Sequence, residues 1–159
     1  MKHVLFICVH NSARSQMAEA YLKMFGGDDF QAESAGFEPT SINPLVVEAM
    51  REEGVDLSGK QTRKVFDLYS AGQVFDYVIT LCGEGMEKMC PVFPGMTHRL
   101  HLPIEDPAKL TGSHEEQMAG LRLIRDRIKA AVLDFIEWTR SPGKKRLGNM
   151  WEFKILYED

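Results

Sequence analysis

The sequence lacks the features that mark membrane proteins, secreted proteins and disulfide-stapled domains. No apolar run approaches the roughly 18–20 residues that a membrane span needs, and the apolar stretch near the N-terminus is too short for a secretory signal. Only three of the 159 residues are cysteine, too few for a disulfide framework. These absences predict a cytoplasmic protein, with no membrane partner, whose thiols are structural, metal-binding or reactive.

The chain also lacks a strong charge of either sign. Its 19 Lys and Arg against 23 Asp and Glu give a net charge of −4 at pH 7, which argues against a nucleic-acid partner bound through bulk charge. Apolar residues make up 44% and charged residues 26% of the chain, ordinary proportions for a globular protein. There is no internal repeat or low-complexity tract, and the length suits one domain.

Strand and helix patterns alternate along the chain. Short runs rich in branched and aromatic residues predict strands at 2–8, 30–35, 75–81 and 99–103. Helical periodicity predicts helices at 13–25, 44–53, 65–71 and 113–138. Asn11 and Ser12 are expected to cap the first helix, and Pro44 suits the first turn of the second. The alternation predicts a three-layer α/β/α domain with a four-stranded parallel sheet.

We expect this domain to span residues 1–138 and to be followed by a C-terminal extension at 139–159. A basic, turn-rich linker at 141–146 leads to a final segment that is too apolar for a disordered tail. That segment either docks on its own domain or packs against a partner subunit, which would mean self-association.

A thiol and a guanidinium stand six positions apart where the first strand meets the first helix. Cys8 and Arg14 form a Cys-x5-Arg motif, at the strand end where open α/β sheets bind ligands. Loop N–H groups and the helix N-terminus can form a nest for an anion, and Arg14 can clasp two oxygens of a tetrahedral oxyanion. The same field favours the Cys8 thiolate, a nucleophile. The predicted oxyanion loop comprises Val9, His10, Asn11, Ser12, Ala13, Arg14 and Ser15. The alternative is a buried strand-end cysteine beside a surface arginine.

Five stretches resemble the low-molecular-weight protein tyrosine phosphatase superfamily, and within it the thioredoxin-coupled arsenate reductases. They are FICVHNSARSQMAEA (6–20), ESAGFEP (33–39), INPLVVEAMREEGVDLS (42–58), DYVITLCGEGMEKMCPVFPG (76–95) and the dipeptide Asp106-Pro107. The first and fourth stretches are specific, and the others are supportive. The resemblance covers nearly the whole chain to about residue 138.

The resemblance implies a role for each thiol. On the family's scheme Cys8 attacks arsenate, Arg14 and the loop amides hold the oxyanion, and Asp106 is the general acid. Cys82 then attacks Cys8, releasing arsenite, and Cys90 attacks Cys82, leaving a Cys82–Cys90 disulfide for thioredoxin to reduce. No bound cofactor is implied. Apart from the family, Cys82 and Cys90 could be inert thiols or, less readily because Cys-x7-Cys is not a zinc spacing, a metal site.

A Cys82–Cys90 disulfide requires a short distance between the Cα atoms of the two cysteines. In one helix the two Cα atoms would lie about 12 Å apart, whereas a disulfide needs about 4.4–6.8 Å. The three Gly and two Pro of 82–96 predict a long loop with room for one helical turn. Because the bridge requires this loop to bend, we expect it to be the most mobile part of the reduced protein.

Two departures from the family bear on function. Phosphatases of this fold place an aromatic residue after the Asp-Pro, but here Ala108 follows, which favours a small inorganic oxyanion over an aryl phosphate. Some arsenate reductases hold a structural potassium ion, and Asn11, Glu19 and Ser34 match three of its ligands. Lys64 stands where an acidic ligand is expected, so we expect its ammonium group to replace the cation and predict no bound metal.

Three functions remain open. The first is an arsenate reductase that depends on thioredoxin as external reductant. The second is a phosphatase that forms a phosphocysteine at Cys8, with Cys82 as a redox guard. The third is a non-enzymatic oxyanion-binding or redox-sensing module.

Overall fold

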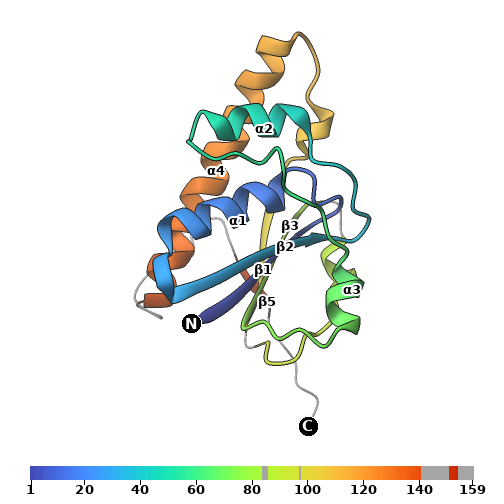
Figure 1. Cartoon of the computed structure of the whole chain (residues 1–159), viewed down its shortest axis with the longest axis vertical. Helices are drawn as coiled ribbons and strands as arrows, with labels where there is room; N and C mark the ends of the chain where they lie inside the picture. Colours follow the sequence, from blue (N-terminus) through green and yellow to red (C-terminus); the bar gives the residue numbers. More distant parts are fainter. Residues whose placement is uncertain (84–85, 97, 141–150, 154–159) are drawn as a thin grey trace.

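The computed structural model describes residues 1–83, 88–96 and 98–140 and the backbone of 86–87 and 151–153. These residues form one sheet of five strands in the order β2-β1-β3-β4-β5 (Figure 1). The strands are β1 (Lys2–Cys8), β2 (Phe30–Gly36), β3 (Tyr77–Cys82), β4 (His98–Ile104) and β5 (Trp151–Phe153). The first four are parallel, which confirms the predicted α/β fold class, and β5 runs antiparallel to β4.

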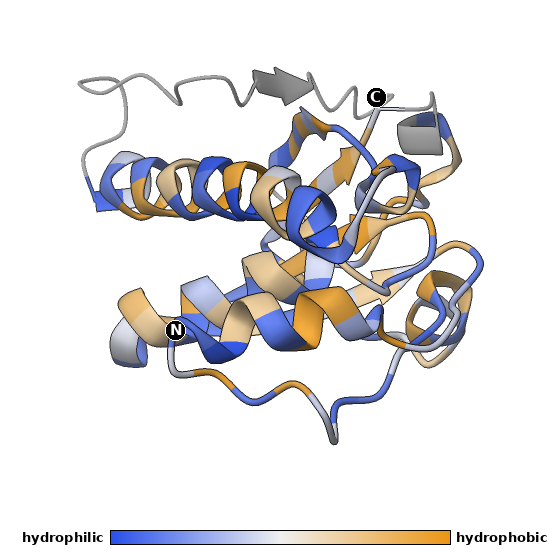
Figure 2. Cartoon of the chain, turned by 90° about the horizontal axis from the view of Figure 1, so that it is seen from above, coloured by the Kyte–Doolittle hydropathy of each residue, from blue (hydrophilic) through white to orange (hydrophobic). Residues whose placement is uncertain are grey.

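Helices cover both faces of the sheet. They are α1 (Arg14–Phe25), α2 (Pro44–Arg51), α3 (Val65–Ser70) and α4 (His114–Arg140). The apolar residues of α1, α2 and α4 pack on one face, whereas those of α3 pack on the other, and Figure 1 shows α3 on the side of the strands opposite α1 and α4. In Figure 2 the ribbons of α1 and α4 alternate between hydrophilic and hydrophobic residues, as expected of helices with one buried face.

The central strands are apolar throughout because both of their faces are covered. In β1, Val4, Phe6 and Cys8 face the layer of α1 and α4, while the residues between them face the layer of α3. In β3 the same alternation directs Leu81 toward the first layer and Cys82 toward the second. The first and second cysteines of the chain therefore point to opposite faces of the sheet.

Most boundaries agree with the sequence to within a few residues, and the differences have local causes. Pro44 occupies the first turn of α2 as expected, and Asn43 caps that helix by accepting a 2.9 Å hydrogen bond from the Leu45 N–H. The capping predicted for Asn11 and Ser12 is wrong, because the residue before α1 is Ala13 and no side chain caps that helix. The strand predicted from residue 75 begins at Tyr77.

The end of the chain adds a strand that the sequence analysis did not predict. β5 pairs with β4 of the same chain, with Arg99 opposite Phe153 and His101 opposite Trp151, which agrees with docking of the extension on its own domain. α4 continues to Arg140, so the boundary expected after residue 138 falls inside a helix. The rest of the extension, 141–150 and 154–159, lies outside the described residues.

The segment predicted as a long loop contains a short turn of 3-10 helix, Met86–Met89. Its mobility stays a prediction, and residues 84–85 are not described. Although α4 runs for 27 residues, no helix in the described part of the chain has an apolar stretch that could cross a membrane.

Candidate active site

The loop between β1 and α1 is held by backbone hydrogen bonds from the segment that follows β2. Four of its carbonyl groups point toward that segment and accept from it. The bonds run from Phe37 N–H to Cys8 O (3.3 Å), Glu38 N–H to Val9 O (2.8 Å), Thr40 N–H to His10 O (3.0 Å) and Asn43 N–H to Ser12 O (3.0 Å). In a planar trans peptide the N–H points away from the C=O. Because these carbonyl groups point toward the segment after β2, the N–H group of each of the same peptide units points to the opposite side of the loop, as an anion nest requires.

Gly36 permits this close approach. A Cβ built on it would lie 2.7 Å from Asn11 N, 2.8 Å from His10 C and 2.8 Å from Val9 O. These neighbours are backbone atoms that cannot rotate away. The strand predicted at 30–35 ends just before Gly36, and no role at the site was predicted for this glycine. Its place in the stretch ESAGFEP was the available clue to such a role.

Asn11 fixes the conformation of the loop through its backbone and its side chain. It is fully buried and has a φ of 53°, in the left-handed region that few residues other than glycine adopt but that asparagine tolerates. Its side-chain amide donates to Ser15 Oγ at 2.7 Å, and its side-chain oxygen accepts from the Arg63 N–H at 3.0 Å and from Gln16 Nε2 at 3.1 Å. Both polar atoms of the Asn11 side chain thus form hydrogen bonds, and these bonds hold the loop to α1 and to residue 63.

The Cys8 sulfur lies at the end of this network. It is 2.9 Å from Ser15 Oγ, and only 2% of Cys8 is exposed. Because Asn11 donates to the Ser15 oxygen, the hydroxyl proton of Ser15 can point at the sulfur. A hydrogen bond of that kind favours a thiolate over a thiol.

Arg14 connects the loop to the end of β4. Its guanidinium is buried and donates from Nη1 to Ile104 O at 2.8 Å. Two residues further along, the Asp106 carboxylate accepts a 2.9 Å hydrogen bond from the Ala108 N–H and caps the turn Pro107–Lys109. The sequence-predicted nucleophile, arginine and acid therefore all lie at the carboxyl end of the parallel sheet.

The other two thiols lie on the opposite face. Cys82 and Cys90 share the buried cluster on the α3 side, whereas Cys8 belongs to the cluster on the α1 and α4 side. None of the three cysteines forms a disulfide. Burial raises the pKa of the Cys90 thiol to about 11, against a smaller opposing effect of Arg99. In this reduced form Cys82 and Cys90 belong to one buried cluster, and Cys8 belongs to the cluster on the other face of the sheet.

Comparisons with known proteins decide the family. Residues 3–145 match the model of the low molecular weight phosphotyrosine protein phosphatases. The chain belongs to this family. An arsenate reductase of Bacillus licheniformis is 42% identical over 139 residues, which covers 86% of this chain and 96% of that protein.

Solved structures agree with this family assignment. A structure described as an arsenate reductase in the phosphate binding state has a TM-score of 0.69 and 30% identity, covering 86% of this chain and 98% of the other. The thioredoxin-dependent arsenate reductase of Corynebacterium glutamicum has a TM-score of 0.60 and 35% identity, covering 87% of this chain and 63% of the other. The resemblance inferred from the sequence, to the arsenate reductase branch of the phosphatase family, is confirmed.

Within this family framework, the expectation for Lys64 is wrong. Lys64 is exposed and precedes α3, whereas the ammonium group beside Glu19 is that of Lys60, with Nζ 2.6 Å from Oε2. Lys23 Nζ lies 2.9 Å from the same oxygen, and Ser34 Oγ donates to the other at 2.9 Å. Burial acts to raise the pKa of Glu19, but the two lysines outweigh it and hold that pKa below its ordinary value.

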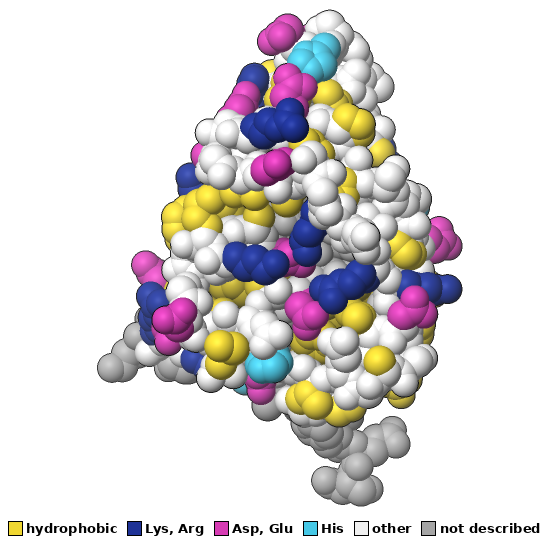
Figure 3. All heavy atoms as spheres, in the orientation of Figure 1, with side chains coloured by type: hydrophobic (Ala, Val, Ile, Leu, Met, Phe, Trp, Pro, Cys, Tyr) yellow, Lys and Arg dark blue, Asp and Glu magenta, His cyan; other side chains and the backbone are white. Residues whose placement is uncertain are grey.

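The described residues contain no cluster of the side chains that usually bind metal ions. Among the side chains that the structure describes, in 1–83, 88–96 and 98–140, no three His, Cys, Asp or Glu come together as a metal site would need. On the face drawn in Figure 3, basic and acidic side chains are interspersed. That face therefore carries no broad positive patch that would attract an anion.

Proposed function

We propose that this chain is an arsenate reductase that converts arsenate to arsenite through Cys8, Cys82 and Cys90. The observation that carries the proposal is the pair of buried thiols beyond the loop cysteine, in a chain that is 42% identical to an arsenate reductase. A phosphatase of this family needs one thiol. A reductase must also supply two electrons, and a dithiol is a ready source of them.

The first step uses the loop at the end of β1. Arsenate, a tetrahedral oxyanion, binds to the N–H groups of loop 9–15 and to Arg14. The Cys8 thiolate attacks arsenic while Asp106 gives a proton to an arsenate oxygen, which leaves as water. Ser15 Oγ lies 2.9 Å from the Cys8 sulfur, where its hydroxyl can donate a hydrogen bond to the thiolate that attacks.

The second step transfers the electrons. The Cys82 thiolate attacks the Cys8 sulfur, the pair of electrons of the S–As bond stays on arsenic, and arsenite leaves behind a Cys8–Cys82 disulfide. Since the two side chains start on opposite faces of the sheet, the end of β3 must rearrange for this attack.

The third step moves the disulfide away from the site. Cys90 loses its proton, attacks Cys82 and frees Cys8, leaving a Cys82–Cys90 disulfide for an external dithiol protein to reduce. Its pKa of about 11 keeps Cys90 protonated at neutral pH, so its attack has to follow a change in surroundings. The thioredoxin dependence of the Corynebacterium glutamicum relative supports thioredoxin as the reductant.

Steady-state assays test the proposal. With thioredoxin, thioredoxin reductase and NADPH, we expect arsenate to start NADPH oxidation in the wild type. Cys82→Ser and Cys90→Ser should each abolish multiple turnover. Unchanged turnover in either variant would refute the relay.

The phosphatase alternative is tested with the same proteins. Cys8, Arg14 and Asp106 would suffice for hydrolysis of a phosphate ester, but the position after Asp106-Pro107 holds Ala108 and no aromatic side chain. Hydrolysis of p-nitrophenyl phosphate that needs Cys8 but neither Cys82 nor Cys90, together with no arsenate-dependent NADPH oxidation, would establish the phosphatase instead.

A further inference from the structure

An ion pair with a buried carboxylate joins α1 to the segment 60–63, which passes beside the oxyanion loop. Glu19 of α1 has only 2% of its side chain exposed, and Lys60 Nζ lies 2.6 Å from its Oε2. The Lys60 side chain is itself 29% exposed, against 55% for Lys23, the second lysine on that carboxylate. Lys60 is therefore less exposed to water than Lys23, and water weakens its attraction to Glu19 less than it weakens that of Lys23.

The residues just after Lys60 hold the loop by their backbone. The Arg63 N–H donates to Asn11 Oδ1 at 3.0 Å, and Arg63 O accepts from the Gly36 N–H at 2.8 Å. Gln61 O accepts from Gln16 Nε2 at 3.3 Å, and the same nitrogen donates to Asn11 Oδ1 at 3.1 Å. Segment 60–63 thus supports the left-handed Asn11, and through it the Ser15 hydroxyl beside the Cys8 sulfur.

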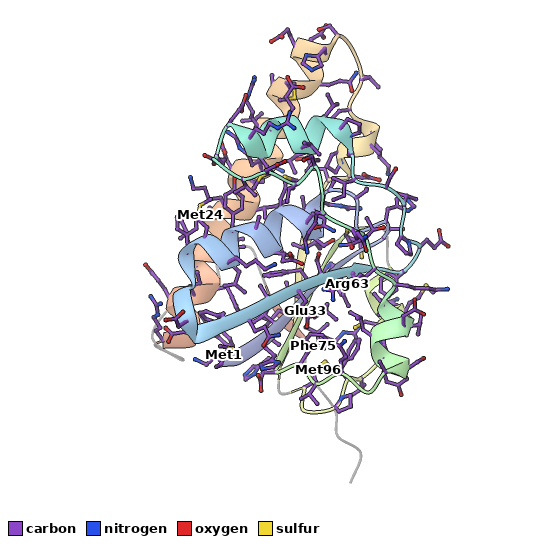
Figure 4. The ribbon with its side chains drawn as sticks, viewed as in Figure 1. Met1, Met24, Glu33, Arg63, Phe75 and Met96 are labelled. Atoms are coloured by element: carbon purple, nitrogen blue, oxygen red, sulfur yellow. The ribbon has the colours of Figure 1, made fainter. Side chains whose placement is uncertain are left out.

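A side-chain ion pair farther along reinforces the attachment of this segment to the sheet. Arg63 Nη1 lies 2.9 Å from Glu33 Oε1 on β2, and Figure 4 shows the two side chains side by side. Both side chains of that pair are partly exposed, at 35% and 20%. In the Lys60–Glu19 pair the carboxylate is only 2% exposed, so water screens that pair less and it is the firmer anchor.

We propose that Lys60 is a positioning residue for the oxyanion loop. Its ammonium group neutralises the buried Glu19 and fixes segment 60–63 where Arg63 and Gln61 can hold Asn11 and Gln16. The inference rests on the proposed function only in taking loop 9–15 as an oxyanion site. Without Lys60 the segment loses its anchor, Asn11 is less firmly held, and both oxyanion affinity and the hydrogen bond to Cys8 weaken.

The test compares Lys60→Met with Lys23→Met. Each variant removes one ammonium group from the same carboxylate, but only Lys60 belongs to the segment that holds the loop. Inorganic sulfate, titrated by calorimetry, serves as a stable tetrahedral probe. We expect Lys60→Met to weaken sulfate binding by about tenfold or more, since small misplacements at a site are costly, and Lys23→Met to change it by less than about twofold.

A second readout separates positioning from general stability. The rate of Cys8 alkylation by iodoacetamide is followed against pH. We expect the midpoint to move to higher pH in Lys60→Met, because the thiolate loses part of its hydrogen-bond support, and to stay in place in Lys23→Met. Lys60→Arg, which keeps the charge, should recover most of both losses. If Lys60→Met fails to fold, Lys60→Gln, which keeps a hydrogen-bond donor, is measured in the same way.

The outcomes have distinct meanings. Equal sulfate affinity and equal alkylation midpoints in Lys60→Met and Lys23→Met would overturn the inference, even if Lys60→Met unfolds at a lower urea concentration. Wild-type protein that binds neither sulfate nor arsenate would count against the proposed function, and the alkylation profiles would still decide the role of Lys60.

Discussion

The loop at 8–15 and the segment at 86–96 both carry a cysteine of the proposed relay, but they are built in opposite ways. Cys8 ends a network of polar side chains in which Asn11 and Ser15 are fully buried and bonded. Cys90 lies among apolar residues of the α3-side cluster, and its sulfur has a 3.4 Å contact to Pro91 O. The difference teaches that a polar network surrounds one thiol, whereas burial among apolar groups disfavours the charged form of the other.

The conformation of the loop at 8–15 depends on the close backbone approach at Gly36, so we expect Gly36→Ala to cause the largest effect. The added Cβ would collide with the backbone at Val9, His10 and Asn11. Arsenate reduction should fall by about 100-fold, and the free energy of unfolding by about 1–3 kcal/mol. Gly59→Ala is the matched control, because a Cβ there meets nothing within 4 Å. Equal activity of the two variants would show that the close approach is unimportant.

The contrast between the surroundings of Cys8 and Cys90 predicts selective labelling. At pH 8, a short pulse of iodoacetamide should modify Cys8 about tenfold or more faster than Cys90, because alkylation follows the thiolate and burial raises the pKa of Cys90 to about 11. Peptide mass spectrometry locates the label, and the same pulse in urea provides the unfolded control. Faster labelling of Cys90 in the folded protein would reverse the comparison.

Backbone protection should also differ between the two regions. The amides of Phe37, Glu38 and Thr40 donate to the loop carbonyls and should exchange slowly with solvent deuterium. The amides of 86–92 should exchange faster, as expected for a segment that must refold during the relay. Hydrogen exchange read by mass spectrometry tests this, and protection of 86–92 equal to that of the central strands would contradict it.

The smallest expected effect is on stability at alkaline pH. The pKa of Cys90 is higher in the folded protein than the value of about 8.5 expected of an unfolded chain. Its contribution to the free energy of unfolding is therefore complete at low pH and is lost as pH rises from about 8.5 through 11. Urea titrations at pH 8 and pH 10.5 should show a smaller loss in Cys90→Ala than in the wild type. An identical loss would show that the thiol is not held neutral.

The sequence predicted the parts of this comparison that depend on local pattern. The apolar run before Cys8, the Cys-x5-Arg spacing and the helix signals around Pro44 each lie within a few residues. They were enough to predict the parallel sheet and the strand–loop–helix junction at Cys8 and Arg14. The opposite facing of Cys8 and Cys82 follows from strand alternation, but only once the register of β3 is known.

The parts that were missed depend on contacts between distant residues. Asn11 looks like a helix cap in sequence, yet its partner is the backbone of Arg63, 52 positions away. Lys60 rather than Lys64 reaches Glu19 because the path of the chain before α3 decides which lysine turns inward. The pairing of β5 with β4 likewise joins residues about 50 positions apart, and no periodicity in the sequence reports it.

Mass spectrometry of the protein after arsenate treatment, without any reductant, tests the central claim most directly. The account predicts one new disulfide, between Cys82 and Cys90, with Cys8 recovered as a free thiol, and in Cys90→Ser a trapped Cys8–Cys82 disulfide. Three unmodified thiols after treatment, or a disulfide that leaves Cys82 out, would contradict it.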